Sequence, residues 1–209
     1  GLAERILTAV KNPVYECLIS NTLASQGIGN VVLARPAGPK HVVAVAFLID
    51  SYCLGVKSTL GHYLTYHEYD HEFRERLLTD QKARPIPPAE AKRFILAAVA
   101  FAQKYGFSPD EDFAKMFRLF GDIETAPEPE PFQFGKDGKP FFVNGPMDSQ
   151  ARVRQILATL ARTAGEGNYH YMMSINPNHY GISNPLPEDT VEFDDDFEDD
   201  DEDETEEVK

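Results

Sequence analysis

The residues best suited to metal chemistry are two histidines and a glutamate within the stretch His67-Glu-Tyr-Asp-His71. This stretch fits the H-E-x-x-H pattern of zinc hydrolases, in which two histidines on one helix face bind Zn²⁺ and the glutamate activates a bound water. Glu90 lies nineteen residues beyond His71 and is the candidate third ligand. The pattern raises the hypothesis of a zinc site made of His67, His71 and Glu90, with Glu68 as the catalytic base.

The surrounding residues favour a different interpretation of this stretch. Asp70 lies inside the motif, and four charged residues follow within residues 72–76, which is the composition of a solvated helix face. Three prolines separate His71 from Glu90 and make a poor frame for a rigid third ligand. We therefore favour a solvated helix with no bound metal and no cofactor, and keep the zinc site as the alternative.

A second candidate is Asp50, which follows an apolar stretch and precedes Ser51, Tyr52 and Cys53. Sites often gather beyond the ends of strands, so this carboxylate, with Lys57 nearby, could form a polar site. Aspartate at such a position also caps turns by accepting hydrogen bonds from the backbone. We favour the turn-capping interpretation.

Two further groups of residues have simple structural explanations. The stretch Gly135-Lys-Asp-Gly-Lys139 lacks the spacing of a phosphate-binding loop, and its Asp137-Gly138 pair suits a hairpin turn. Aromatic residues that could stack on a planar ligand lie near the C-terminus. These are Tyr169, His170, Tyr171, His179 and Tyr180. We favour a strand in which His170 alternates with its tyrosine neighbours, followed by a loop that contains His179.

The elements that must position these residues are helices and strands in mixed order. Valine-rich stretches at Asn30–Arg35 and His41–Cys53 predict strands joined by a turn at residues 36–40. The run from Val42 to Ile49 is apolar without alternation, which predicts a central strand covered on both faces. Residues 125–131 alternate proline and glutamate and predict an irregular connector.

Helices are predicted from apolar spacing and from their end signals. The stretch Ser108-Pro-Asp-Glu111 matches a capping box that would open a helix ending near Gly121. The other predicted elements are helices at Leu2–Val10, 66–78, 88–105 and about 148–164, a hairpin of 132–134 with 141–143, and a last strand at Tyr169–Ile175. We expect an α+β fold, a single domain with a mixed, mainly antiparallel sheet packed by helices.

Charge divides the chain into two parts. The chain has 34 acidic residues and 20 lysines and arginines, and residues 188–209 alone contain fifteen of the acids and one lysine. Residues 1–187 therefore hold 19 acids and 19 bases, so the net charge of −14 belongs to the C-terminal segment. Such a segment cannot bury enough apolar surface to fold, which predicts a domain at 1–187 and a disordered acidic tail at 188–209.

The same distribution bears on partners and on location. A balanced body argues against nucleic acid, whose phosphates require a concentrated positive surface. Cys17 and Cys53 lie in apolar runs without metal or redox spacing, so we expect buried, inert thiols. No stretch reaches the length of about 20 apolar residues that a membrane span requires. We therefore expect a cytoplasmic protein that does not enter a membrane.

Four motifs together resemble one known group of proteins. They are Val31-Val-Leu-Ala-Arg35, Phe47-Leu-Ile-Asp-Ser-Tyr-Cys-Leu-Gly-Val-Lys57, Tyr105-Gly-Phe-Ser-Pro-Asp110 and Phe134-Gly-Lys-Asp-Gly-Lys-Pro-Phe-Phe-Val-Asn-Gly-Pro146. Over most of residues 10–175 the chain resembles a family of uncharacterised bacterial cytosolic proteins. The resemblance implies a bacterial cytosolic domain with the acidic tail as an appendage, and it implies no activity.

Two functions from different classes remain open on the sequence. The first is a non-catalytic interaction or accessory protein, whose body binds a protein partner and whose tail contacts basic surfaces or aids solubility. The second is a zinc-dependent hydrolase that uses His67, Glu68 and His71. We favour the first, and the sequence fixes neither the partner nor the oligomeric state.

Overall fold

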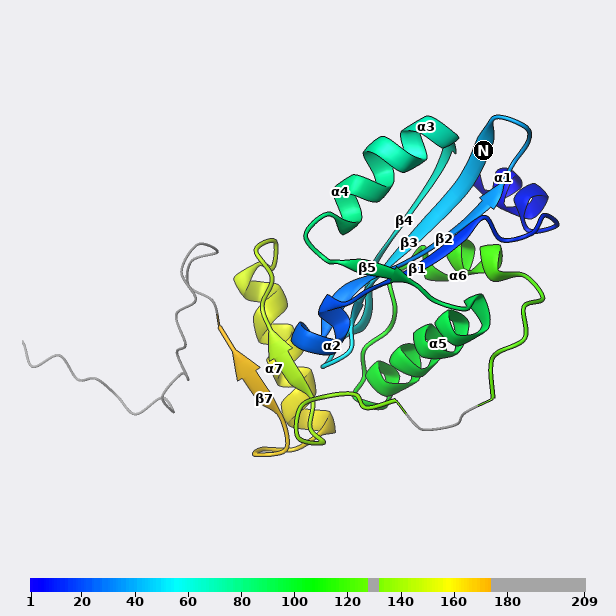
Figure 1. Cartoon of the computed structure of the whole chain (residues 1–209). Helices are drawn as coiled ribbons and strands as arrows, with labels where there is room; N and C mark the ends of the chain where they lie inside the picture. The colour runs from blue at the N-terminus through cyan, green and yellow to red at the C-terminus, as the bar shows by residue number, and fades with distance from the viewer. Residues whose placement is uncertain (128–131, 174–209) are drawn as a thin grey trace, which may run out of the picture.

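Five antiparallel strands form the main sheet, in the order β4-β3-β2-β1-β5 (Figure 1). The computed structural model describes residues 1–127 and 132–173. The strands, given in chain order, are β1 (Glu16–Ser20), β2 (Ile28–Pro36), β3 (His41–Asp50), β4 (Gly55–Thr65) and β5 (Ala83–Pro85). The sheet therefore has a long edge strand, β4, on one side and a three-residue edge strand, β5, on the other.

The valine-rich strands β2 and β3 occupy the interior of this sheet. They pair from Ile28 opposite Asp50 to Pro36 opposite Val42. Side chains alternate between the two faces, so Val43, Val45 and Phe47 of β3 enter one hydrophobic core while the residues between them enter another. The prediction that β3 is covered on both faces is confirmed.

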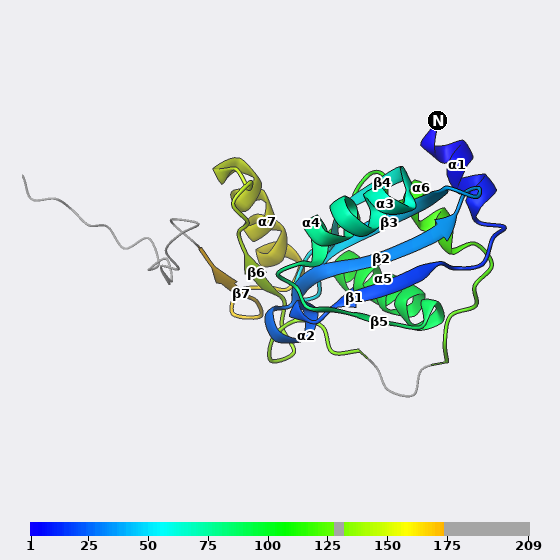
Figure 2. The same cartoon turned by 45° about the horizontal axis from the view of Figure 1, so that its top comes forward.

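Different helices cover the two faces (Figures 1 and 2). One face packs against α1 (Leu2–Ala9), α5 (Pro88–Lys104), α6 (Phe113–Phe117) and the 3₁₀ turn η2 (Arg118–Phe120). The opposite face packs against a helical segment made of α3 (Tyr66–Glu68), a π-helical stretch η1 (Tyr69–Phe73) and α4 (Arg74–Leu78). The short helix α2 (Thr22–Gln26) connects β1 to β2.

The C-terminal part of the described chain forms a smaller layer at one end of the sheet (Figure 2). It contains β6 (Phe141–Val143), α7 (Gln150–Thr163) and β7 (His170–Met172), with β6 and β7 paired in parallel. Its core of Phe142, Ile156 and Leu160 packs with Cys53 of the β3–β4 connection and Phe107. Helix α5 contributes to this core through Ala102 and to the main core through Ala98 and Val99, and the predicted α+β fold, a single domain with a mainly antiparallel sheet, is confirmed.

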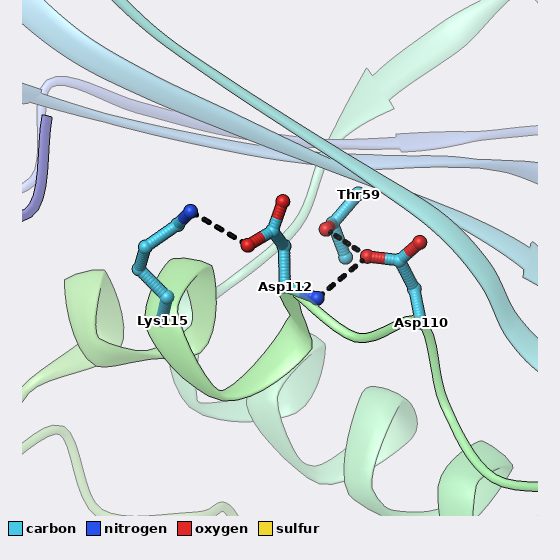
Figure 3. A network of polar contacts seen from close by, with 4 residues as sticks. All are labelled: Thr59, Asp110, Asp112 and Lys115. Carbon is cyan, nitrogen blue, oxygen red and sulfur yellow. Dashed lines mark hydrogen bonds and ion pairs between the residues drawn. The ribbon is translucent and has the colours of Figure 1, made fainter.

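The predicted capping box at Ser108–Glu111 is wrong. Helix α6 begins at Phe113 with Asp112 at its N-cap, so Pro109 and Glu111 lie outside it. The reason is tertiary: the Asp110 carboxylate accepts hydrogen bonds from Thr59 Oγ1 at 2.7 Å and from the Asp112 backbone N–H at 3.0 Å (Figure 3). The Asp110 N–H also donates to the carbonyl of Val56. These bonds hold the segment against β4 in a non-helical conformation.

The predicted hairpin of 132–134 with 141–143 is also wrong, although its turn exists. Asp137 and Gly138 adopt positive φ, and a bridge between Lys136 and Lys139 closes the turn. The phenylalanines at 132 and 134 do not continue this ladder, because their rings pack on Phe94 of α5. Strand β6 pairs in parallel with β7 instead, and helix α7 connects the two strands.

Several predictions fall partly or wholly outside the described chain. The acidic tail at 188–209, the stretch 174–187 and residues 128–131 lie outside it, so the boundary at residue 187 stays a prediction. Across residues 1–127 and 132–173, no helix is long and apolar enough to cross a membrane.

Candidate functional site

The two histidines of the H-E-x-x-H stretch lie side by side on the outer surface of the helical segment α3–η1. Their ring centroids are 4.6 Å apart, and both side chains are exposed. Glu68 faces the start of the helix, where its carboxylate accepts hydrogen bonds from the Thr65 backbone N–H at 2.7 Å and from Thr65 Oγ1 at 2.8 Å. These bonds lower the pKa of Glu68, so this carboxylate caps the helix.

The proposed third ligand does not converge with these histidines. Glu90 lies in the first turn of α5, and α5 covers the face of the sheet opposite to α3 and η1. His71 approaches Glu75 instead, with Nδ1 and Oε1 3.9 Å apart. Within the part of the chain that the structure describes, no group of three or more histidines, cysteines, aspartates or glutamates has the arrangement of a metal site.

Asp50 is a buried turn anchor at the end of β3. One carboxylate oxygen accepts from the backbone N–H groups of Tyr52 and Cys53 at 3.0 and 3.1 Å, and the other accepts from that of Leu54 at 3.1 Å. Burial raises the pKa of Asp50, while the backbone bonds and the charge of Lys57 oppose that rise. With three donors aimed at it, this carboxylate holds the β3–β4 connection, which confirms the turn-capping prediction.

The groups around Asp50 also serve the fold. Ser51 donates its hydroxyl proton to the carbonyl of Gly27 at 3.1 Å. Cys53 is fully buried, and burial raises the pKa of its thiol. Burial likewise raises the pKa of the Cys17 thiol to about 12, so both cysteines stay protonated and unreactive at neutral pH. The predicted burial of both thiols is confirmed, and the Ser51 hydroxyl beside Asp50 is engaged with the Gly27 carbonyl.

The aromatic group near the C-terminus is only partly described. Tyr169 and Tyr171 are half-buried, with ring centroids 6.1 Å apart, and His170 between them is exposed. This alternation along β7 agrees with the predicted strand. His179 and Tyr180 lie outside the described residues, so the structure does not place them.

Two polar anchors were missed by the sequence reasoning. Glu16 of β1 accepts a hydrogen bond from the hydroxyl of Tyr69 at 2.6 Å and pairs with Arg74 at 3.3 Å. Tyr69 is fully buried, and burial together with the Glu16 carboxylate raises the pKa of its hydroxyl. This trio ties η1 and α4 to the sheet. Because the tyrosine is sealed from solvent, it cannot meet a substrate.

The second missed anchor is Arg35 of β2, which lies buried among carbonyl groups. Its guanidinium donates to the carbonyls of Leu119 at 2.9 Å, Phe120 at 3.0 Å and Val10 at 3.1 Å, and also to that of Asn12. Desolvation lowers the pKa of Arg35, but an arginine stays charged in this setting. The side chain therefore joins α1 and η2 to the sheet.

Across the described residues, the buried ionisable side chains are engaged in holding elements together. The exposed features of the described chain include the imidazole pair and the outer edge of β4. Comparisons with protein-family models, with curated proteins and with solved structures found no match to this chain.

Proposed function

We propose that this protein is a non-catalytic interaction or accessory protein, whose body binds a protein partner and whose acidic segment at 188–209 contacts basic surfaces. The observation that carries the proposal is the charge partition. Fifteen carboxylates fall within these residues, whereas residues 1–187 are balanced at 19 acids and 19 bases. A polyanion of this density attracts cationic surfaces over distances that salt shortens to about 8 Å at physiological ionic strength.

The chemistry of the described body supports a binding role. Asp50 accepts three backbone hydrogen bonds, Arg35 donates to four carbonyls, and the Tyr69 hydroxyl is sealed inside the core. Catalysis needs a nucleophile or base that can reach a substrate. These three groups stabilise the fold. The proposed binding therefore takes place on the surface of the protein.

A cytoplasmic location belongs to the same proposal. The free thiols of Cys17 and Cys53 suit a reducing compartment. The resemblance to uncharacterised bacterial proteins likewise stays a prediction.

The test uses a lysine-rich peptide of defined length as the basic probe. Three chains are compared by titration calorimetry: the full chain, a chain ending at residue 187, and a full chain whose fifteen acids at 188–209 are changed to asparagine and glutamine. Only the native chain is expected to bind, with an affinity that falls steeply between about 50 and 200 mM salt because counterion release drives association of this kind.

A fourth chain separates charge from sequence. It carries the residues of 188–209 in scrambled order, and it should bind the probe as the native chain does if net charge is the recognised feature. Equal binding by the chain ending at residue 187, or binding that high salt leaves unchanged, would refute the role of the acidic segment.

A further inference from the structure

Strand β4 exposes the long free edge of the main sheet. It contains eleven residues and pairs with β3 from Gly55 opposite Asp50 to Thr65 opposite His41. On its other side, the carbonyl of Val56 accepts from the N–H of Asp110. Among the described residues, no backbone hydrogen bond joins residues 57–64 to any segment other than β3. Every second residue of this stretch therefore offers an N–H and a C=O to a further strand.

The segment at Asp110 contacts the start of this edge at Val56 and Thr59, and beyond that point the edge lacks the features that keep sheet edges from pairing. Proteins protect such edges with short strands, prolines, repeated charges or a covering segment. The opposite edge, β5, has three residues and ends in Pro85. Strand β4 contains no proline and one charged residue, Lys57. Its single bulge lies near the start, at the position of Leu48 and Ile49 on β3, so the remaining part runs regularly.

The side chains along β4 also suit a partner strand. Leu60 is 41% exposed, and its neighbours on the same face, Ser58 and His62, are exposed and polar. On the other face, Gly61 leaves room for Met116 and Leu2 to pack close beneath the strand, and the ring of Tyr63 lies against His41 and Arg5. The middle of the edge is neutral, and Ser58, Leu60 and His62 are exposed along it.

We propose that a second copy of this chain pairs with β4 through its own β4, antiparallel about a two-fold axis near Leu60 and Gly61. The two five-stranded sheets would then join into one sheet of ten strands. Antiparallel pairing sets the Lys57 end of one strand opposite the Tyr63–Thr65 end of the other, so the only charged residue of the strand does not face its own copy.

Charges beside the strand complement one another under this symmetry. Near Tyr63, the Arg5 guanidinium lies 4.3 Å from the ring centroid. Near Thr59, the segment Asp110–Asp112 carries three acids; Asp110 binds the Thr59 hydroxyl, and Asp112 binds Lys115 at 2.6 Å (Figure 3). Lys115 already pairs with Asp112, so the two-fold axis would bring Arg5 of each copy toward Asp110 and Glu111 of the other. Complementary charges of this kind fix register and favour the correct pairing.

The test is the oligomeric state of the full chain by sedimentation equilibrium, from about 1 µM to about 1 mM protein, a range that covers weak association. A reversible dimer is expected. Leu60→Lys places like charges near the two-fold axis and should raise the dimer dissociation constant at least about tenfold. The matched control is Leu96→Lys on α5, since Leu96 is 39% exposed and belongs to a helix, not to the pairing strand, and it should leave the constant unchanged.

A second pair of variants tests the register without touching the strand. Arg5→Glu should weaken the dimer several-fold, and adding Glu111→Arg should restore it by reversing both charges. Circular dichroism verifies that each variant is folded. A chain that stays monomeric throughout, or a dimer that neither Leu60→Lys nor Arg5→Glu weakens, would overturn the proposal. A monomer would mean that β4 does not pair with a second copy of this chain. A dimer that neither variant weakens would mean that the interface lies elsewhere.

Discussion

Replacing Asp50 by alanine is expected to lower the free energy of unfolding by about 3 kcal/mol. The carboxylate accepts from three backbone N–H groups, and two of these belong to the buried residues Cys53 and Leu54. Each buried donor left without a partner costs about 1–3 kcal/mol. Part of this loss is offset, because the variant no longer buries a carboxylate. The net effect is a large share of the about 5–15 kcal/mol that stabilises a typical domain.

Asp50→Asn is the sharper variant. Its amide keeps one carbonyl oxygen for two of the donors but turns an NH₂ group toward the N–H of Leu54, so we expect a loss of about 1–2 kcal/mol. The assay is urea unfolding followed by far-ultraviolet circular dichroism, since the chain has no tryptophan. The control is Asp137→Asn at an exposed turn where φ is 53°, a conformation that asparagine tolerates, and it should change stability by less than about 0.5 kcal/mol. If Asp50→Asn is as stable as the native chain, the hydrogen bond from Leu54 does not contribute to stability. That result would refute the interpretation of Asp50 as a turn anchor.

Three further outcomes are expected. Hydrogen bonds at the helix cap lower the pKa of Glu68 from its ordinary 4.5. The Glu68 carboxylate therefore stabilises the fold above pH 4.5, and this stabilisation is lost as pH falls through the folded pKa. In Glu68→Gln, stability to urea should depend less on pH in acid. Gly27→Ala should lower the free energy of unfolding by at least about 2 kcal/mol, since its Cβ would lie 2.4 Å from the ring of Tyr52. Gly167→Ala has a similar φ and open space around its Cβ, and it should lower the free energy of unfolding by about 1 kcal/mol in the same urea assay. Mass-spectrometric metal analysis of untagged protein should find less than stoichiometric zinc; one zinc per chain that is lost in His67→Ala would show a zinc site at His67 and favour the hydrolase alternative.

Local patterns were reliable where the local residues decide the structure. The apolar run of β3 predicted a central strand, because only burial on both faces suits a strand without polar alternation. The helix α5 followed from its opening prolines and the apolar positions between Ala91 and Ala102. At Ser108 the local signal failed, because bonds from Asp110 to β4 outweighed a capping motif. The main helices and the two central strands could be predicted, whereas the strands β1, β4 and β5 and the contacts between distant segments could not.

The anchors that explain the candidate site depend on such distant contacts. Tyr69 and Glu16 are 53 residues apart, and Arg35 reaches carbonyls 84 and 85 residues along the chain. The only signals in the sequence were Glu16 at the start of an apolar strand and Arg35 inside another. Neither signal indicates which distant residue forms the hydrogen bond. Asp50 was predictable because its donors lie within four residues of it. Short-range hydrogen bonds leave a trace in the sequence, whereas long-range ones become visible only when the fold is known.

The H-E-x-x-H stretch could nevertheless have been interpreted more sharply from helix geometry. Tyr69 and Phe73 are four residues apart, and so are His67 and His71, but the two pairs are offset by two residues, which is about 200° around a helix. Since the aromatic pair is buried against the sheet, the imidazoles must point into solvent. A zinc enzyme needs its histidines in a cleft where ligands from other elements converge. Tyr69 inside the motif and Phe73 just after it therefore favour histidines that face solvent, where they are available for contacts with other molecules.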